Sequence, residues 1–381
     1  MTWPLLPESV VVARVLDTTV VFGQHSGMLV RLDDVGRFVL EHREHFADHT
    51  DAAQELTELL AADRGEVDED LAALESALAD LAVEDPPPID PSVGRAVAAP
   101  AGTEPAAWAI DALGVPVVVR GHSPRLVDVL APLLAAHPRT AAVPAHRFDV
   151  WEEEDGITVA RDDRVIHERG GIDGAVNSLI AGITIAAILA PRLNIALHAA
   201  AVADGPAAVL IGGGSGVGKS TTTVELTADG WTFLTDELVE LDTSSGRITG
   251  LPRPIGLEGA ARGWRQELLP PWSDAEHDLH RWPVPPTLIG DVGTTGQLGL
   301  IVHLEFDGAD PARVQPIEPL EALGRLCGLT FNRDRLTAEV LTELGQLLAR
   351  VPSIVLHHGG AGGAARAVAD HWRGLRRGCE R

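Results

Sequence analysis

Lysine and tyrosine are the residues that this sequence most lacks. Of its 30 basic residues 29 are arginine and one, Lys219, is lysine, and the 381 residues include no tyrosine. The two cysteines, Cys327 and Cys379, are too few for a disulfide framework, and no Cys/His cluster has the spacing of a zinc site. In a chain so poor in lysine, we expect the single one to stand where arginine cannot replace it.

Positive charge and long apolar runs are also scarce. Fifty-five acidic residues give a net charge of −25, which argues against nucleic acid or an anionic membrane as partner, because both are bound through clustered Lys and Arg. The first ten residues lack the basic and apolar segments of a signal peptide. The longest apolar stretch, 179–190, is about 12 residues long, too short to span a bilayer. We therefore expect a soluble, cytoplasmic protein without nucleic-acid or membrane partners.

The length and the 45% apolar content allow two or three domains with a large core. Prolines gather between residues 84 and 105 without any periodic pattern, as in a linker. The sequence thus predicts a small α+β winged helix-turn-helix domain at 1–84, a Pro-rich linker at 85–105, and an α/β domain with a mixed sheet at 106–381.

Residues 1–84 contain three strand patterns followed by three amphipathic helix patterns. The segment holds 5 arginines, no lysine and 18 acidic residues, a net charge of −13, which argues against DNA as the partner of a winged helix here. The strands are expected at residues 10–16, 18–22 and 28–32. The helices are expected to begin at Asp33–Asp34, at Asp48 or Thr50, and at Asp68.

This order of strands, glycine turn (23–27), apolar strand, the segment LDDVGR at 32–37 and acidic helices resembles the PqqD family of ribosomal peptide biosynthesis. The resemblance covers nearly all of residues 7–84. It implies a peptide-recognition domain that holds the leader of a precursor peptide as an added strand at a sheet edge. A purely structural winged domain is the alternative.

Residues 106–170 are rich in strand patterns. A helix is expected at 123–136, and a buried helix lies within 172–189. Strands are expected near 115–119, 148–151 and 157–160, the last two joined by a turn that ends in Asp155-Gly156.

Residues 213–220, GGSGVGKS, fit the phosphate-loop pattern G-x-x-x-x-G-K-[ST] in full. An apolar strand ends at 209–211 and a helix pattern follows at 221–227, which is the context that the pattern requires. Glycines let successive N–H groups surround phosphate oxygens, Lys219 can reach the β- and γ-phosphates, and Ser220 can ligate Mg²⁺. The nucleotide-binding residues are expected to be Gly213, Gly214, Ser215, Gly216, Val217, Gly218, Lys219, Ser220 and Thr221.

Two acidic residues follow the next strand pattern. Residues 230–235 read as a strand that ends in Asp236 and Glu237. Carboxylates at the end of a strand beside a phosphate loop stand where a metal ligand or a catalytic base belongs. A helix-capping or solvated acidic pair is the alternative.

The region from about 115 to 369 resembles the HPr kinase/phosphorylase family, especially shorter relatives found with peptide biosynthesis genes. The resemblance rests on Leu197-His198-Ala199, the 213–220 loop, Gly230 and Asp236-Glu237, and it extends over 252–255 and strands at 298–304 and 353–358. It implies that Asp236 is the general base toward an acceptor serine, that Glu237, where the family usually has Asp, binds Mg²⁺, and that His198 gives polar support in the active site. A buried core histidine is the alternative for His198.

The sequence departs from that family after the phosphate loop. The signature Glu-x-Arg-Gly-x-Gly has no clear counterpart, since the nearest text, 257–263, has other spacing. This puts the reverse phosphorylase reaction and HPr as substrate in doubt. Arg253 and Arg262 are candidates for stabilising the transferred phosphoryl group. Trp264, Trp272 and Trp282 lie in a Pro-rich stretch that suits a substrate-facing flap or ordinary packing.

The leading hypothesis is an ATP- and Mg²⁺-dependent kinase that phosphorylates a Ser or Thr of a precursor peptide whose leader the first domain holds. The alternative is a scaffold that binds the precursor and recruits other peptide-modifying enzymes, with a structural or regulatory nucleotide site. A small-molecule kinase is a third reading, which leaves the acidic first domain unexplained. The family assembles as hexamers, so the resemblance suggests a homo-oligomer, although no pattern indicates the interface and the added first domain could block it.

Overall fold

The computed structural model describes residues 3–4, 6–60, 62–81, 94–100, 104–191, 194–258 and 281–379. The chain forms two compact units, residues 1–89 with 318–350 and residues 90–317 with 351–381. The sequence-based boundaries at 84 and 105 stay a prediction beside this division, which assigns residues 318–350 to the unit that contains the N-terminal segment. The expected mixed α/β character is confirmed, whereas the winged-helix assignment stays a prediction.

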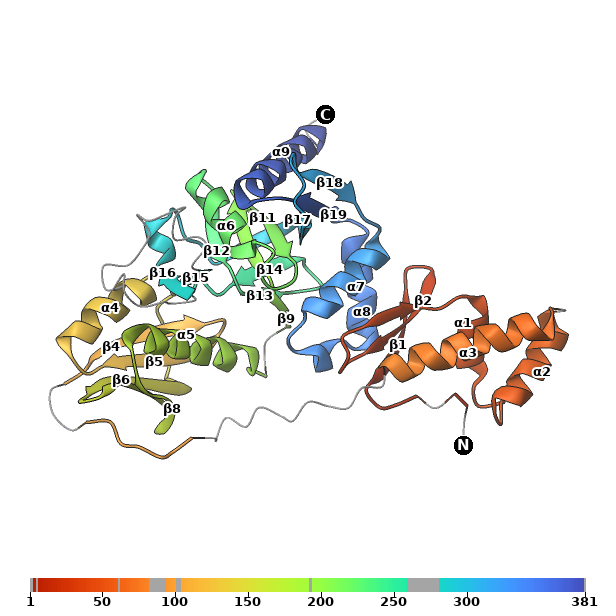
Figure 1. Ribbon diagram of the computed structural model, residues 1–381, viewed down its shortest axis with the longest axis horizontal. Helices are drawn as coiled ribbons and strands as arrows, with labels where there is room; N and C mark the ends of the chain where they lie inside the picture. Colours follow the sequence, from red (N-terminus) through yellow and green to blue (C-terminus); the bar gives the residue numbers. More distant parts are fainter. Residues whose placement is uncertain are drawn as a thin grey trace. The chain divides into compact units, whose positions relative to one another are not determined.

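The first unit begins with an antiparallel sheet in the order β1-β2-β3 and continues with three helices (Figure 1). Asp33 caps the first helix by accepting a hydrogen bond from the N–H of Gly36. The third helix begins at Arg64, four residues before the expected Asp68, because buried Val67 extends its apolar face. The elements are β1 (Val10–Val15), β2 (Thr18–Gly23), β3 (Leu29–Arg31), α1 (Asp34–His42), α2 (His49–Leu60) and α3 (Arg64–Leu81).

The face of this sheet that does not pack on α1–α3 also carries apolar side chains. In the strand register Val11 lies opposite Phe22, and Ala13 lies opposite Val20, so these side chains share one face. Helices α7 (Pro319–Leu329) and α8 (Ala338–Leu348) belong to the same unit, and α8 packs on β1. Residues far apart in the sequence therefore complete the core of the first unit.

Gly345 of α8 is the closest point of this packing. A Cβ at Gly345 would lie 2.2 Å from a methyl carbon of buried Val15. We expect Gly345→Ala to destabilise the unit by about 1–3 kcal/mol, because the crowded core has to shift. The matched control is Gly324→Ala in α7, where the nearest atom lies at 4.0 Å and better helix propensity stabilises by about 0.5–1 kcal/mol. Thermal unfolding of both variants measures the contrast, and equal effects would contradict the packing.

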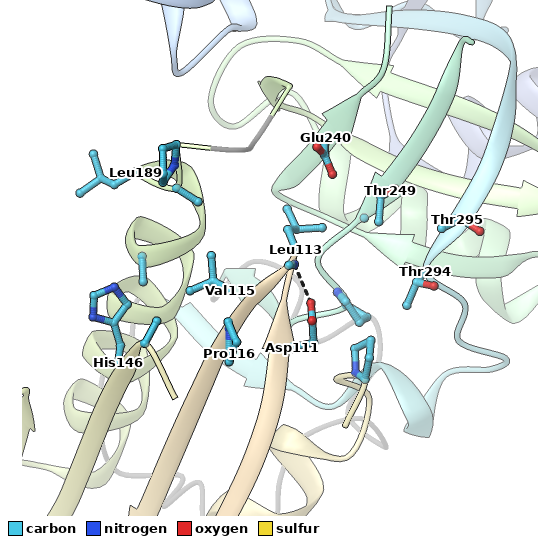
Figure 2. Close-up of a pocket in the computed structure, with 18 of the residues that line it drawn as sticks. Asp111, Leu113, Val115, Pro116, His146, Leu189, Glu240, Thr249, Thr294 and Thr295 are labelled. Carbon is cyan, nitrogen blue, oxygen red and sulfur yellow. Dashed lines mark hydrogen bonds between the residues drawn. The ribbon is translucent and has the colours of Figure 1, made fainter. Parts of the chain in front are cut away.

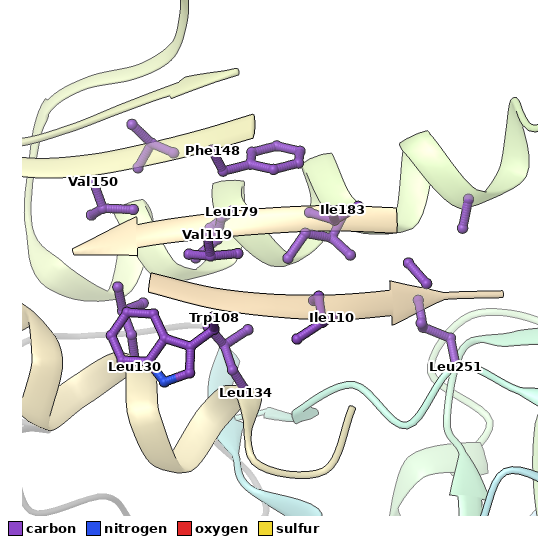
Figure 3. Close-up of a cluster of buried hydrophobic side chains, with 14 of the residues drawn as sticks. Trp108, Ile110, Val119, Leu130, Leu134, Phe148, Val150, Leu179, Ile183 and Leu251 are labelled. Carbon is purple, nitrogen blue, oxygen red and sulfur yellow. The ribbon is translucent and has the colours of Figure 1, made fainter. Parts of the chain in front are cut away.

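The second unit contains a five-stranded sheet in the order β4-β5-β6-β7-β8. Its buried side chains share one hydrophobic core with helices α4 and α5, and Figure 3 shows this core as far as Leu251. Leu238 belongs to the same core. The expected 148–160 hairpin is confirmed. The elements are β4 (Ala106–Ala112), β5 (Val115–Gly121), α4 (Pro124–Leu134), β6 (His146–Glu153), β7 (Gly156–Arg161), β8 (Arg164–Gly170) and α5 (Ile172–Ile188).

A nine-stranded mixed sheet forms the rest of this unit, with the path β12-β10-β11-β17-β14-β13-β9 and the pair β18-β19 beside β17. Strand β11 is parallel to β17, and β17 is parallel to β19, so these three strands end on the same edge. Helices α6 and α9 pack together, and both contribute to the core that this sheet buries. The strands are β9 (Ile195–His198), β10 (Ala200–Asp204), β11 (Ala207–Gly212), β12 (Thr232–Thr235), β13 (Leu238–Leu241), β14 (Arg247–Gly250), β17 (Thr295–Phe306), β18 (Arg313–Pro316) and β19 (Ser353–His358). The helices are α6 (Lys219–Ala228) and α9 (Ala361–Cys379), and a separate pair of strands is β15 (Ile255–Glu258) and β16 (Arg281–Val284).

Part of the expected linker lies along the five-stranded sheet. The N–H of Val97 donates to the carbonyl of Asp163, and the N–H of Val165 donates to that of Arg95, at 2.9 and 3.0 Å. No helix within the described ranges is long and apolar enough to cross a membrane.

Candidate functional site

The glycine loop, residues 213–220, joins the end of β11 to the start of α6. Gly213 has a φ of +145°, and a Cβ there would lie 2.8 Å from the carbonyl oxygen of Leu304. Gly218 has a φ of +94° and stands at the N-cap of α6, where no side chain caps the helix. Both glycines are needed on conformational grounds, and the uncapped first turn leaves N–H groups that favour an anion.

The side chain of Lys219 folds back onto the glycine loop. It is 8% exposed, and its Nζ donates to the carbonyl oxygens of Gly213 and Gly214, both at 2.9 Å. The Thr221 hydroxyl donates to the carbonyl of Gly218. The loop therefore holds a buried cation against two of its own carbonyl oxygens, while Ser215 is exposed to solvent.

Asp236 comes directly after β12 and meets the glycine loop. The Ser220 hydroxyl donates to Asp236 Oδ2 at 3.0 Å, and the N–H of Gly256 donates to the same oxygen at 3.4 Å. Asp236 is 1% exposed. A carboxylate this buried has to be compensated by nearby donors and cations.

Arg253 supplies such a cation and connects the two acidic residues. Its Nε lies 3.6 Å from Asp236 Oδ1, and its Nη2 lies 3.7 Å from Glu237 Oε2. Glu237 Oε1 lies 3.4 Å from Nε2 of His198, and the His198 side chain is more exposed than that of Glu237. The structure thus brings Asp236, Glu237, Arg253 and His198 together beside the glycine loop.

The surroundings of Arg253 are buried. Its Nη1 donates to Thr184 Oγ1 of α5 at 3.4 Å. The pKa of His137 is lowered to about 4, above all by burial, with smaller contributions from the guanidinium groups of Arg139 and Arg253. A neutral imidazole here adds no second positive charge near Arg253. His137 therefore does not repel the guanidinium that pairs with Asp236 and Glu237.

Replacing Arg253 tests this compensation. Arg253→Gln leaves the buried Asp236 without its cation, and we expect a loss of about 3 kcal/mol. For a unit of this size that lowers the Tm by about 6–12 °C, with partial recovery in Arg253→Lys. The control is Arg377→Gln on the exposed face of α9, which should leave the Tm within about 1 °C. Equal Tm values for the Arg253→Gln and Arg377→Gln proteins would show that Arg253 compensates nothing.

The predicted site residues lie in two groups that meet at Ser220 and Asp236. The loop residues 213–221 form the first, and His198, Asp236, Glu237 and Arg253 form the second. Their roles toward nucleotide, metal and acceptor stay predictions. Arg262, Trp264 and Trp272 lie outside the described residues, as does the side chain of Trp282. No group of three or more metal-ligating side chains stands together in the described part of the chain.

Three contacts of the site have no counterpart in the sequence-based expectations. These are the Thr184 hydroxyl, the Gly256 N–H and His358, whose Nε2 lies 3.0 Å from the carbonyl oxygen of Val217 in the loop. A sequence signal existed for His358, because it ends the predicted strand at 353–358 and the ends of parallel strands meet at one edge. Thr184 and Gly256 carry no such signal.

Comparisons with known proteins give a distant likeness. No family model matches the chain, and no curated protein matches it. Among solved structures, the chain is similar to the HPr(Ser) kinase/phosphatase of Coxiella burnetii, with 15% identity and a TM-score of 0.29, over 49% of this chain and 92% of that one. At this level of similarity, the roles of individual residues have to be argued from the site itself.

Proposed function

We propose that this chain is an ATP-dependent phosphotransferase that phosphorylates a Ser or Thr hydroxyl of a peptide. The observation that carries the proposal is the hydrogen bond from the Ser220 hydroxyl to Asp236 Oδ2, 3.0 Å long. It places a carboxylate at the mouth of a loop whose cation is Lys219 and whose helix N-terminus is uncapped. An alcohol donating to a fixed carboxylate is the contact that a general base makes with its substrate.

The residues present fit magnesium-bound ATP. The uncapped first turn of α6 and the Lys219 amine suit phosphate oxygens, and the oxygens of Ser220 and Glu237 suit Mg²⁺. When bound, the magnesium nucleotide supplies the phosphoryl group and neutralises part of its charge.

Each charged residue of the site then has its own role in the transfer. Lys219 and the α6 N–H groups stabilise negative charge on the phosphates. Asp236 takes the proton of the acceptor hydroxyl as the oxygen–phosphorus bond forms and the bond to the leaving phosphate breaks. Arg253 holds the carboxylates of Asp236 and Glu237 in place through the contacts at 3.6 and 3.7 Å.

The first unit suits the holding of a peptide. Within the described residues β3 pairs with β2 alone, so its other edge can accept an added strand. A cavity of about 660 Å³ in this unit is lined by Val20, Leu29 and Arg31 of the sheet and by Leu320 and Gly324 of α7. We infer that this unit holds the leader of a precursor peptide, which raises the effective concentration of its acceptor residues.

A scaffold is the second candidate, and the burial of Asp236 favours it. This carboxylate is 1% exposed and already engages Ser220, Gly256 and Arg253, which is also the arrangement of a structural ion pair. A scaffold binds nucleotide and precursor without turnover.

Incubation with radiolabelled ATP, Mg²⁺ and a Ser/Thr-containing precursor peptide separates the two candidates. We expect a phosphopeptide whose modified Ser or Thr is identified by mass spectrometry. Saturable binding of ATP and precursor without phosphate transfer would contradict the phosphotransferase and support the scaffold.

A further inference from the structure

The glycine loop lies between two sets of strand ends. Strands β12, β11, β17 and β19 run in the same direction, so their carboxyl ends share one edge of the nine-stranded sheet (Figure 1). Asp236 follows β12 on one side of the loop, and Phe306 ends β17 on the other. The proposed function puts the terminal phosphate of the nucleotide toward Asp236. The nucleoside at the opposite end of the phosphate chain therefore points toward the end of β17.

Phe306 is an aromatic side chain that the fold leaves in solvent at this place. It is 61% exposed, although it lies on the face of β17 on which Val302 and Leu304 are buried. In the strand register it lies beside His358, and the two rings meet edge to face with 5.7 Å between their centroids. The buried His358 ring contacts the glycine loop in turn, since its Nε2 lies 3.0 Å from the carbonyl oxygen of Val217. One imidazole ring therefore connects the exposed Phe306 ring to the loop.

Small residues stand near the Phe306 ring where α9 begins. The segment that joins β19 to α9 and forms its first turn, residues 359–363, reads Gly-Gly-Ala-Gly-Gly. Helix α9 packs on β19, and its Ala365 and Val368 are buried there. Ala361 lies four and seven residues before these two, so its methyl group shares the helix face that is turned toward the sheet. This segment offers no side chain larger than a methyl group to cover Phe306, which leaves room for a flat ring beside it.

A large cleft in the same unit lies too far from the loop to hold the nucleoside. Its volume is about 790 Å³, and Figure 2 shows Thr294 and Thr295 among the residues that line it. Thr295 begins β17 and Phe306 ends it, about 36 Å of extended strand apart. A nucleoside triphosphate is shorter than this strand, so its base cannot reach the cleft while its phosphates lie on the loop.

We propose that Phe306 is the platform on which the base of the bound nucleotide stacks. The base lies with one face on the Phe306 ring, beside the glycine-rich start of α9, while the phosphate chain crosses the glycine loop. Stacking uses the flat face that every purine presents, so the platform accepts adenine and guanine alike. The inference rests on the proposed function, because it places the nucleoside of the same nucleotide.

Titration of the full-length protein with magnesium-bound ATP and with magnesium-bound tripolyphosphate tests the platform. Phe306→Ala should weaken ATP binding about tenfold, the size of one contact between an aromatic ring and a base, and should leave tripolyphosphate binding within about twofold. Phe306→Trp should keep the affinity for ATP, because it retains a flat aromatic face. The matched control is Phe331→Ala, the same change at an exposed phenylalanine of the first unit, and its affinity for ATP should equal that of wild type.

Phosphate transfer to a peptide is measured separately, so the platform and the proposed function can fail independently. A loss of ATP affinity in Phe306→Ala, without a loss of tripolyphosphate affinity, supports the platform even if no peptide is phosphorylated. Equal ATP affinity in Phe306→Ala and wild type overturns the platform even if wild type phosphorylates a peptide. An equal loss for ATP and tripolyphosphate, or the same loss in Phe331→Ala, overturns it as well, and wild type that binds no ATP contradicts both proposals.

Discussion

Replacing Asp236 by asparagine is expected to lower the phosphotransfer rate by about 10²–10⁴-fold, the range that a positioned general base contributes. The amide oxygen can still accept the Ser220 hydroxyl, which Asp236 receives at 3.0 Å. The amide cannot take a proton from the acceptor, so kcat falls while affinity for the magnesium nucleotide stays within a few-fold. Single-turnover kinetics with radiolabelled ATP and direct nucleotide binding separate these effects.

The control for this variant is Asp242→Asn. It makes the same chemical change in the β13–β14 turn, where Asp242 accepts hydrogen bonds from Ser244 and Ser245, and its turnover should equal that of wild type. Normal turnover in the Asp236→Asn protein would show that Asp236 is not the general base. If Glu237→Gln then abolished turnover, the role would belong to Glu237.

Replacing Lys219 by alanine is expected to weaken binding of magnesium-bound ATP by about 10–100-fold, because a charge-assisted hydrogen bond contributes about 1.5–3 kcal/mol. Lys219→Arg should recover little, since Lys219 is 8% exposed and its amine fits between the carbonyls of Gly213 and Gly214. The planar, forked guanidinium fits such a place poorly. Equilibrium dialysis with labelled ATP measures both variants.

Affinity for the precursor peptide is the internal control of the Lys219 variants. The first unit is proposed to hold the leader, and Lys219 belongs to the second unit. Anisotropy with a labelled leader peptide should therefore give the same Kd in Lys219→Ala and wild type. A parallel fall of both affinities would contradict this division of tasks.

The local elements of the site could be predicted from the sequence because they depend on neighbouring residues. The apolar strand, the glycine loop and the following helix obey backbone preferences that the letters of 207–228 express directly. Helix α6 begins at Lys219, two residues before the helix pattern expected at 221–227, because Gly218 at its N-cap already sets the start of the helix. The position of Asp236 and Glu237 follows from the same kind of local pattern, because they come directly after a strand.

Contacts between distant segments could not be predicted in this way. Thr184 belongs to an apolar helix pattern, and its contact with Arg253 joins residues 69 positions apart. The packing of Gly345 against Val15 joins the two ends of the first unit. Amphipathic periodicity shows that a helix such as 338–348 has an apolar face, but it does not say which sheet covers that face.

Calorimetric titration of magnesium-bound ATP into the full-length protein tests the central claim most directly, namely that the glycine loop 213–220 binds a nucleotide phosphate chain. The account predicts one saturable site per chain, with affinity reduced about 10–100-fold in Lys219→Ala. Absence of binding heat across several temperatures for ATP and GTP, or equal binding by wild type and Lys219→Ala, would contradict it.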